Sequence, residues 1–251
     1  MKISLCIITR NEEENLRRCL TSAAELVDQI VVLDSGSTDD TEAVAKEFGA
    51  LWKTREWSGF VDQKNAVLDL AENEWVLSLD GDEALSSTLA EELLSLKKLS
   101  PEPESSGFCM PRCVCYEGRW IRHGDWYPDR LVRFFRKSKA HFAGGKVHER
   151  LEIEGPILSL KGDIEHYSFR SIKDHEERGE HYAQLWAESA KENGRSASLL
   201  DPYTHAAARW LRSYIFRGGF LDGQIGWTIA RISTREVFAK YRLLQKLNQS
   251  T

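Results

Sequence analysis

The sequence has no run of 18 consecutive apolar residues, so it contains no segment that could cross a bilayer as a helix. No charged and apolar leader of the secretory kind is visible, because residues 1–2 lead directly into a short strand-like run. Cysteine is scarce, and the five thiols form an odd number that suits a reducing compartment better than a disulfide framework. These absences predict a cytoplasmic protein.

Two common phosphate-binding motifs are also missing. The first strand-like run is followed by residues 9–13 (TRNEE) and not by a Gly-x-Gly-x-x-Gly loop. No Walker A loop with its lysine occurs anywhere in the chain. The sequence therefore argues against the usual nicotinamide-dinucleotide and P-loop folds.

The overall composition is that of an ordinary globular protein. A chain of 251 residues and 28.7 kDa can bury one sizeable core, with room for an appended tail. Hydrophobic residues make up 41% and charged residues 29% of the chain. The formal net charge of −5 argues against a general nucleic-acid binder, so we expect no nucleic-acid partner.

Strand-like and helical segments alternate through the first 80 residues. Strands are expected near residues 3–8, 29–33, 50–53 and 75–80, and helices near residues 12–26, 41–48 and 61–72. Asn11 is the expected N-cap of the first helix. Alternation at this spacing predicts an α/β fold with a parallel sheet and right-handed crossovers.

The rest of the chain changes character twice. Residues 100–107 (SPEPESSG) predict a loop break, and an aromatic-rich, strand-like region follows to about residue 166. From Ser171 onward the pattern is helical. We therefore predict one domain over residues 1–170 and a helical C-terminal extension over residues 171–251. Cys109, Cys113 and Cys115 match no standard zinc spacing and are expected to be structural residues of one strand.

The most informative stretch is residues 75–83 (WVLSLDGDE), where a short apolar run ends in two carboxylates. Side chains two apart in a strand share a face, so Asp80 and Asp82 are expected to point the same way. Clustered carboxylates repel one another unless a cation lies between them, and hard oxygen ligands favour Mg²⁺ or Mn²⁺. An ordinary acidic turn is the alternative interpretation.

Other polar side chains follow the ends of the first two strands. Thr9, Asn11 and Glu12 could form hydrogen bonds with a base or a ribose, and Asp34 could accept from a ring N–H and a ribose hydroxyl. Helix capping by Asn11 and turn formation by Asp34 are the structural alternatives.

Four segments together resemble the ordered signature of glycosyltransferase family 2, whose members have the GT-A fold. They are residues 7–12 (IITRNE), 32–39 (VLDSGSTD), 63–65 (QKN) and 79–83 (LDGDE). The resemblance implies a Rossmann-like, mostly parallel central sheet flanked by helices. It also implies a nucleotide-sugar-binding half over residues 1–100 and an acceptor half over residues 107–170.

The resemblance also assigns roles to individual residues. It implies that the base and ribose of the nucleotide are held by Thr9, Asn11, Glu12 and Asp34. Lys64 would lie near the diphosphate, Asp80 would contact ribose or metal-bound water, and Asp82 would ligate the metal. Independently of the resemblance, a divalent cation stabilises the charge that grows on a nucleotide-diphosphate leaving group.

Further segments resemble the lipopolysaccharide inner-core glucosyltransferase branch of this family. They are residues 127–136 (YPDRLVRFFR), 145–149 (GKVHE), 164–167 (IEHY) and 219–223 (GFLDG). This resemblance implies a metal-dependent inverting transfer of a hexose, with glucose from UDP-glucose as the first choice, onto a heptose of the lipopolysaccharide inner core. Another lipid-linked or polysaccharide acceptor stays an alternative.

An inverting transfer requires a general base near the acceptor hydroxyl. Glu149 is the first candidate because it follows a Gly-Gly turn, and Asp129 is the second because it begins a strand. For each, the structural alternative is an ion pair with its neighbour, Arg150 or Arg130.

A late histidine serves as a further metal ligand in several folds of this class. His166 is the candidate, because it ends a strand-like run before the helical tail, and His148 competes with it.

The C-terminal tail is basic and rich in aromatic residues. Residues 203–247 contain eight Lys and Arg against two Asp and Glu, within a chain of negative net charge. This composition favours peripheral contact with the anionic inner face of the plasma membrane. Packing on the catalytic domain, with the basic face solvated, is the alternative.

Two other functions remain open at this point. A nucleotidyltransferase also pairs strand-end carboxylates with a metal and a nucleotide, but it would need a basic loop where this chain has Glu12–Glu14. A nucleotide-sugar-binding adaptor without activity is the non-enzymatic alternative, and the presence of both Asp80 and Asp82 argues against it.

Overall fold

The computed structural model describes residues 1–144, 149–169 and 171–249. The chain forms two compact units. The sheet unit comprises Met1–Arg112 and Asp129–Tyr167, and the helical unit comprises Cys113–Pro128 and the chain from Ser168 onward. The domain predicted over residues 1–170 included residues 113–128, which the structure groups with the helical unit instead.

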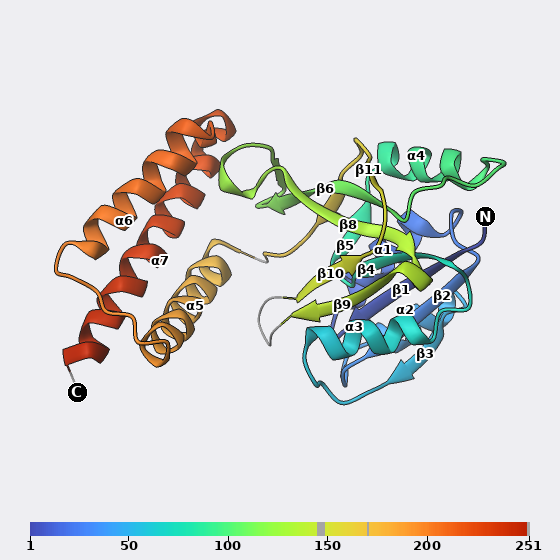
Figure 1. The fold of residues 1–251 in the computed structure, drawn as a ribbon, viewed down its shortest axis with the longest axis horizontal. Helices are drawn as coiled ribbons and strands as arrows, with labels where there is room; N and C mark the ends of the chain where they lie inside the picture. The colour runs from blue at the N-terminus through green and yellow to red at the C-terminus, as the bar shows by residue number, and fades with distance from the viewer. Residues whose placement is uncertain (145–148, 170, 250–251) are drawn as a thin grey trace. The chain divides into compact units, whose positions relative to one another are not determined.

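The secondary-structure elements are shown in Figure 1. The strands are β1 (Ile3–Thr9), β2 (Gln29–Asp34), β3 (Leu51–Thr54), β4 (Trp75–Asp80), β5 (Glu83–Leu85), β6 (Gly107–Tyr116), β7 (Arg119–Ile121), β8 (Asp129–Arg136), β9 (Ala140–Gly144), β10 (Glu149–Ile153), β11 (Ile157–Ser159) and β12 (Ile164–His166). The α-helices are α1 (Glu13–Ala23), α2 (Thr41–Glu47), α3 (Phe60–Asp69), α4 (Ser87–Lys97), α5 (Ile172–Glu192), α6 (Asp201–Trp210) and α7 (Gly223–Gln249). Short 3₁₀ turns occur at η1 (Gly124–Trp126), η2 (Lys137–Lys139) and η4 (Gly219–Asp222), and a π-helix at η3 (Leu211–Phe216).

The central sheet has the strand order β3-β2-β1-β4-β8-β6-β12-β5. The first four strands run parallel to one another, and β8 is antiparallel to both β4 and β6. The α/β class predicted from the alternation is therefore confirmed, as is the helical C-terminal extension. In the register of the sheet Thr9 pairs with Asp34, and Ile8 with Asp80. The carboxyl ends of β1, β2 and β4 thus meet at one edge of the sheet.

Helices cover both faces of the parallel strands, which explains why every residue of β1 is buried and most are apolar. Leu5 and Ile7 lie in one buried cluster with residues of α1, α2 and α4. Cys6 and Ile8 lie in a second cluster with residues of α3 and of the β9–β10 hairpin. The parallel strands are therefore a rigid support for the loops at their carboxyl ends.

The start of α1 differs from the prediction. Asn11 has a left-handed backbone conformation, with φ of 55°, and Glu12 is the N-cap without a side-chain cap hydrogen bond. The Asn11 side-chain oxygen instead accepts a hydrogen bond from the backbone N–H of Thr38 at 2.8 Å. The expected capping by Asn11 is wrong, because its amide joins two loops.

In the helical unit, α5 and α6 both pack against α7. The Ser171 side chain caps α5 by accepting a hydrogen bond from the backbone N–H of Asp174 at 3.1 Å. Segments far apart in the sequence form one buried cluster here, since Tyr116 at the end of β6 and Ile121 at the end of β7 pack with Ile229 of α7. Within the described part of the chain, no helix is both long enough and apolar enough to cross a membrane.

Candidate active site

A cavity of about 330 Å³ opens at the carboxyl edge of the parallel strands. Four predicted site residues line it, namely Thr9, Glu12, Asp80 and Asp82. The other lining residues are Ile8, Arg10, Ser35, Trp57, Phe60 and Gly81. A cleft outside the carboxyl ends of parallel strands is where ligands bind in open α/β sheets.

Gly81 separates the two carboxylates and lies against the first strand. A Cβ atom at this position would lie 2.9 Å from Oγ1 of Thr9 and 3.4 Å from Cβ of Glu12. Thr9 Oγ1 is buried and has no hydrogen-bond partner among the described residues. The absence of a side chain at Gly81 therefore keeps this part of the cavity open, with a hydroxyl that a ligand can satisfy.

Asp34 is buried and organises the loop that follows β2. One carboxylate oxygen accepts from the backbone N–H groups of Gly36 and Ser37, at 2.8 and 2.9 Å, and the other accepts from the Ser37 hydroxyl at 2.5 Å. The turn-forming alternative for Asp34 is thus seen in the structure. A carboxylate has about four acceptor positions, so roughly one remains for a ligand.

Asp80 is held between two buried cations. Lys64 Nζ lies 3.0 Å from one of its oxygens, and Arg133 donates to the other at 2.8 Å. Burial alone would raise the pKa of Asp80, but the charges of Arg133 and Lys64 more than offset this and hold its pKa well below its usual range. Asp80 is therefore an ionised acceptor with fixed orientation.

Behind Asp80, the same network continues through Glu83, which is fully buried. Glu83 accepts from Arg133 at 3.0 Å and from Arg112 at 3.2 Å, and it also accepts from the backbone N–H of Asp80 at 3.0 Å. Burial would lower the pKa of Arg133, but the neighbouring Asp80 and Glu83 raise its pKa above the usual range. Glu83, Arg112 and Arg133 support the site without lining the cavity.

Residues 63–65 lie on one turn of helix α3 and hold two neighbouring segments in place. Gln63 donates to the carbonyl of Glu56 at 2.8 Å. Asn65 exchanges two hydrogen bonds with the backbone of Phe142 on β9, at 2.8 and 2.9 Å. Lys64, between them, is only 2% exposed. The motif thus positions the loop before α3, the β9–β10 hairpin and the cation that contacts Asp80.

Asp82, the second carboxylate of the Asp-x-Asp motif, lies next to His166. Oδ2 of Asp82 is 3.2 Å from Nε2 of His166, and the backbone N–H of Tyr167 donates to the Asp82 carbonyl at 2.9 Å. β4 ends at Asp80, so Asp82 belongs to a turn, and the expectation that both carboxylates share a strand face is wrong.

The Asp82–His166 pair fits one edge of a divalent cation's ligand shell. Two neighbouring ligands of an octahedral Mg²⁺ or Mn²⁺, each at about 2.1 Å, lie roughly 3 Å apart. Among residues 1–144, 149–169 and 171–249, no group of three or more His, Cys, Asp or Glu could hold a metal. A cation here would thus have two protein ligands and would need further oxygens from water or a ligand, as Mg²⁺ often has. The competing candidate, His148, lies outside the described residues.

The two candidate bases have partners other than their expected neighbours. Glu149 begins β10, and its Oε1 lies 3.3 Å from Nζ of Lys64. Asp129 begins β8 and accepts from Arg112 at 2.6 Å. These ion pairs differ from the alternatives with Arg150 and Arg130, and Lys64 contacts both Glu149 and Asp80.

Trp57 and Phe60 were missed by the sequence analysis. They line the cavity in an edge-to-face arrangement with ring centroids 4.7 Å apart, and the Trp57 side chain is 45% exposed. Exposed aromatic rings beside a polar cleft can stack on a base. Their signal in the sequence is weak, because two aromatic residues at the start of a helix are more often part of a core.

A family comparison assigns this arrangement of fold and cleft to a class of enzyme. Residues 4–150 match the model described as glycosyl transferase family 2, which is more than half of the chain. The chain therefore belongs to glycosyl transferase family 2, is a glycosyltransferase, and has in its sheet unit the GT-A fold of that class. Membership of this family argues against both alternatives for this chain, the nucleotidyltransferase and the inactive adaptor.

Individual proteins that resemble this chain over most of its length share less than 30% of its residues. An uncharacterised glycosyltransferase of Rickettsia typhi is 28% identical over 99% of this chain and 87% of its own length. The lipopolysaccharide core biosynthesis glycosyltransferase LpsC of Rhizobium meliloti is 26% identical over 99% of this chain and 96% of its own length. A solved structure of TarS residues 1–349 from S. aureus, in complex with UDP-GlcNAc, is 13% identical, covers 100% of this chain and 93% of that one, and has a TM-score of 0.49.

Proposed function

We propose that this enzyme is a metal-dependent inverting glycosyltransferase that moves a hexose from a UDP-sugar, with UDP-glucose as the first choice, onto a heptose of the lipopolysaccharide inner core. The observation that carries the proposal is the cleft in which Thr9, Asp80 and Asp82 converge. Family membership supplies the reaction class, and the similarity to LpsC supports the acceptor.

The donor side of the proposal uses the polar edge of the parallel strands. The base and ribose are assigned to Thr9, Asn11, Glu12 and Asp34, with Trp57 as the stacking surface. Lys64 and Asp80 form a fixed ion pair, which presents one cation near the diphosphate and one carboxylate to the ribose. These groups bind and orient the donor before transfer, which reduces the entropic part of the barrier.

We assign the metal to Asp82 and His166. When bound, a divalent cation supplies positive charge that stabilises the diphosphate leaving group. The protein's own contribution is to hold a carboxylate that lines the cleft and an imidazole 3.2 Å from it.

The general base is assigned to Glu149, with Asp129 as the second candidate. Glu149 shares Lys64 with Asp80, and this places it beside the donor groups. Asp129 is connected to the same network less directly, through Arg112 and Glu83. The base would accept the proton of the acceptor hydroxyl as that oxygen attacks the sugar carbon.

Thermal stabilisation by UDP and a panel of UDP-sugars, with and without Mn²⁺, tests the donor site. A ligand that binds only the folded state must raise the Tm. We expect a shift for the wild type that requires Mn²⁺ and is lost in Asp82→Ala. No shift with any uridine nucleotide, together with a shift for other nucleoside diphosphate sugars, would replace the proposed donor.

A lipid-linked acceptor implies that the enzyme works at a membrane surface, and we propose peripheral association with the anionic inner face of the plasma membrane. Transfer to purified inner-core acceptors tests the acceptor directly. Activity on another lipid-linked or polysaccharide acceptor alone would keep the reaction class and change the substrate.

A further inference from the structure

Three arginines surround a single carboxylate in the helical unit. The side chain of Asp125, in the turn η1, is only 6% exposed and lies 2.9 Å from Arg209, 3.1 Å from Arg212 and 3.2 Å from Arg217. One carboxylate neutralises one guanidinium, so this cluster carries an excess of about two positive charges. Arg212 and Arg217 are each more than half exposed and can contact a second anion.

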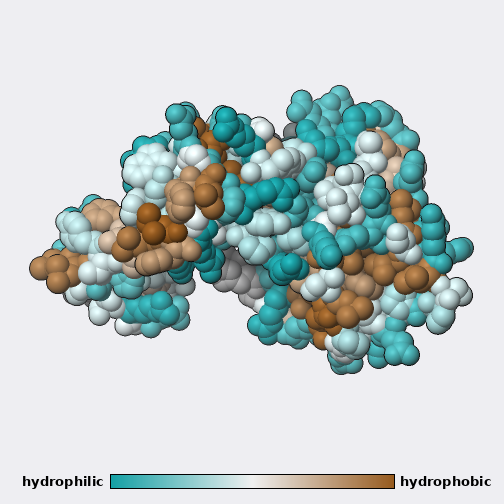
Figure 2. Space-filling view, turned by 90° about the horizontal axis from the view of Figure 1, so that it is seen from above, coloured by the Kyte–Doolittle hydropathy of each residue, from teal (hydrophilic) through white to brown (hydrophobic). Residues whose placement is uncertain are grey.

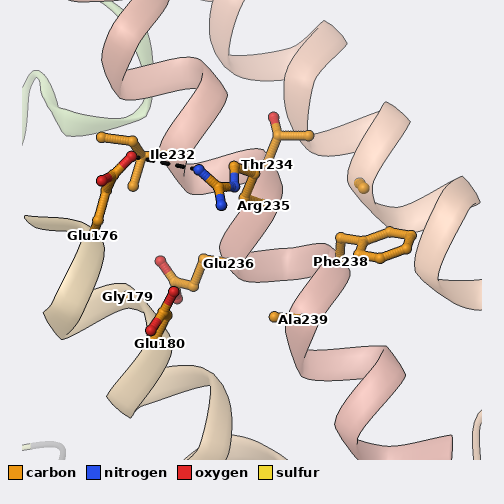
Figure 3. Close-up of a pocket in the computed structure, with 10 residues that line it drawn as sticks. Glu176, Gly179, Glu180, Ile232, Thr234, Arg235, Glu236, Phe238 and Ala239 are labelled. Carbon is orange, nitrogen blue, oxygen red and sulfur yellow. Dashed lines mark hydrogen bonds and ion pairs between the residues drawn. The ribbon is translucent and has the colours of Figure 1, made fainter.

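Elsewhere in this unit, five Lys and Arg residues form ion pairs with carboxylates, and they are Lys173, Arg178, Arg231, Arg235 and Lys240. Figure 3 shows a groove between α5 and α7 with Glu176, Glu180 and Glu236 along it. Glu176 pairs with Arg231 and Arg235, at 3.4 and 3.5 Å. Near Asp125, by contrast, three arginines share one carboxylate, whereas the acidic groove between α5 and α7 does not suit an anion.

Apolar side chains are exposed on the same segment as the arginines. They belong to the π-helix η3 and the turn η4, and are Leu211, Ile215, Phe216, Phe220 and Leu221. Phe216 is 79% exposed and Leu221 is 61% exposed. Figure 2 shows hydrophobic residues gathered on the surface of the helical unit. Large exposed apolar patches on a globular protein mark interaction sites.

The backbone holds this segment in a fixed shape. A Cβ on Gly226 of α7 would lie 1.9 Å from the carbonyl oxygen of Gly219, so only glycine allows this contact between α7 and η4. Asp222 accepts from the backbone N–H and the Nδ1 of His123, at 3.0 and 2.8 Å. The GFLDG motif thus forms a tight turn that presents Phe220 and Leu221 outward.

We infer that this docking surface, made of Arg209, Arg212 and Arg217 with the five exposed apolar residues of η3 and η4, binds an anionic phospholipid membrane. The arginines take headgroup phosphates, and the apolar side chains enter the acyl boundary of the leaflet. A soluble phosphate would use only the arginines and would leave the apolar side chains without a role. The inference rests on the proposed function, because a lipid-linked acceptor is the reason for the enzyme to bind a membrane. The location of the surface rests on the arginines and the exposed apolar residues.

Co-sedimentation with vesicles tests the surface without any turnover. The vesicles are phosphatidylcholine with about 30% phosphatidylglycerol, or phosphatidylcholine alone, because each basic residue near an anionic surface adds to binding. We expect the wild type to bind the anionic vesicles, and Arg212→Gln/Arg217→Gln to bind them roughly tenfold or more weakly. Arg209 stays in place, so Asp125 keeps a partner 2.9 Å away in this variant. Phe216→Ser/Leu221→Ser should also lose binding, since it removes exposed apolar area.

Matched controls come from the same unit. Arg231→Gln/Arg235→Gln removes two exposed arginines elsewhere, and Leu199→Ser removes an apolar side chain that is 73% exposed outside the docking surface. Both controls should bind as the wild type does. Equal losses in controls and test variants, or no loss in either test variant, would overturn the inference.

Two further arms separate the possible failures. Asp82→Ala should lose donor binding and keep vesicle binding, so a failed transferase proposal leaves this result intact. The Tm of the wild type and of Arg212→Gln/Arg217→Gln, each with added inorganic phosphate, tests whether the arginines bind a soluble anion instead. A Tm rise with phosphate that only the wild type shows, without vesicle binding, would replace the membrane by a soluble phosphate compound.

Discussion

Lys64 contacts both Asp80 and Glu149, so its removal should leave two carboxylates without a shared cation. We expect Lys64→Met to weaken donor binding and to lower the free energy of unfolding by about 3 kcal/mol, because the buried network loses one of the two cations that contact Asp80 and the one that contacts Glu149. Chemical denaturation and UDP-sugar titration measure the two effects. Lys64→Arg, which keeps the charge, should lose less stability, and a stable Lys64→Met variant with normal donor affinity would contradict the assigned role.

Gly81 is the residue that keeps the cleft open beside Thr9. A methyl group there would lie 2.9 Å from the Thr9 hydroxyl, so Gly81→Ala should reduce donor affinity by roughly tenfold with a smaller effect on Tm. Gly49→Ala is the matched control, since nothing lies within 4 Å of its added Cβ and its φ is +70°. The control should cost stability through backbone strain and leave donor binding unchanged.

Glu149 and Asp129 are distinguished by charge-neutral variants. Loss of a general base reduces turnover by roughly 10²- to 10⁴-fold, and we expect this of Glu149→Gln but not of Asp129→Asn. Donor binding, followed by Tm shift with UDP-sugar and Mn²⁺, should remain in Glu149→Gln. Near-normal turnover of that variant would remove Glu149 from this role, and a selective loss in Asp129→Asn would transfer the role to Asp129.

At the scale of elements, α3 holds the β9–β10 hairpin through the two hydrogen bonds of Asn65. Each hydrogen bond contributes about 1 kcal/mol, so Asn65→Ala should lower the free energy of unfolding by about 2 kcal/mol. Because Glu149 lies on the released hairpin, kcat should fall more than the donor KM rises. Asn193→Ala, which removes a local bond to Ser189 at the end of α5, should leave both kinetic constants unchanged.

Element alternation and the Asp-x-Asp motif were sufficient to predict which side chains gather at the sheet edge. Parallel strands all end at one edge, so Thr9, Asp34 and Asp80 follow from the pattern alone. The partners of these residues could not be predicted. Arg133 donates to Asp80 across 53 positions of sequence, and the Asn11 side-chain oxygen accepts from the backbone N–H of Thr38, 27 positions away. Contacts of this kind depend on how elements pack, which periodicity does not encode.

At the scale of the whole molecule, the helical unit should respond to pH through His175. Burial lowers the pKa of this histidine, more than the nearby Glu236, Glu176 and Asp174 raise it, and its Nδ1 lies 3.0 Å from the Tyr116 hydroxyl. The unfolded chain, with an ordinary histidine pKa of about 6.5, then binds protons more readily than the folded one. Stability should be full above about pH 6.5 and should fall as the pH drops below it.

Denaturation midpoints between pH 5 and pH 8, roughly the range in which histidine titrates, measure this dependence. His175→Phe should flatten the acid side of the profile, whereas His181→Gln, at an exposed position of the same helix, should leave it unchanged. An identical slope in all three proteins would exclude His175 as its source.

The helical unit is discontinuous in sequence, since Cys113–Pro128 and the chain from Ser168 onward build it together. Truncation after residue 167 would therefore remove Ile229, against which Tyr116 and Ile121 pack. The remaining chain would expose this apolar surface and would not be a stable catalytic domain. The same connectivity restricts exchange by recombination. A new C-terminal tail would have to match a segment encoded at least 40 positions upstream, so the two segments must change together as these enzymes diverge.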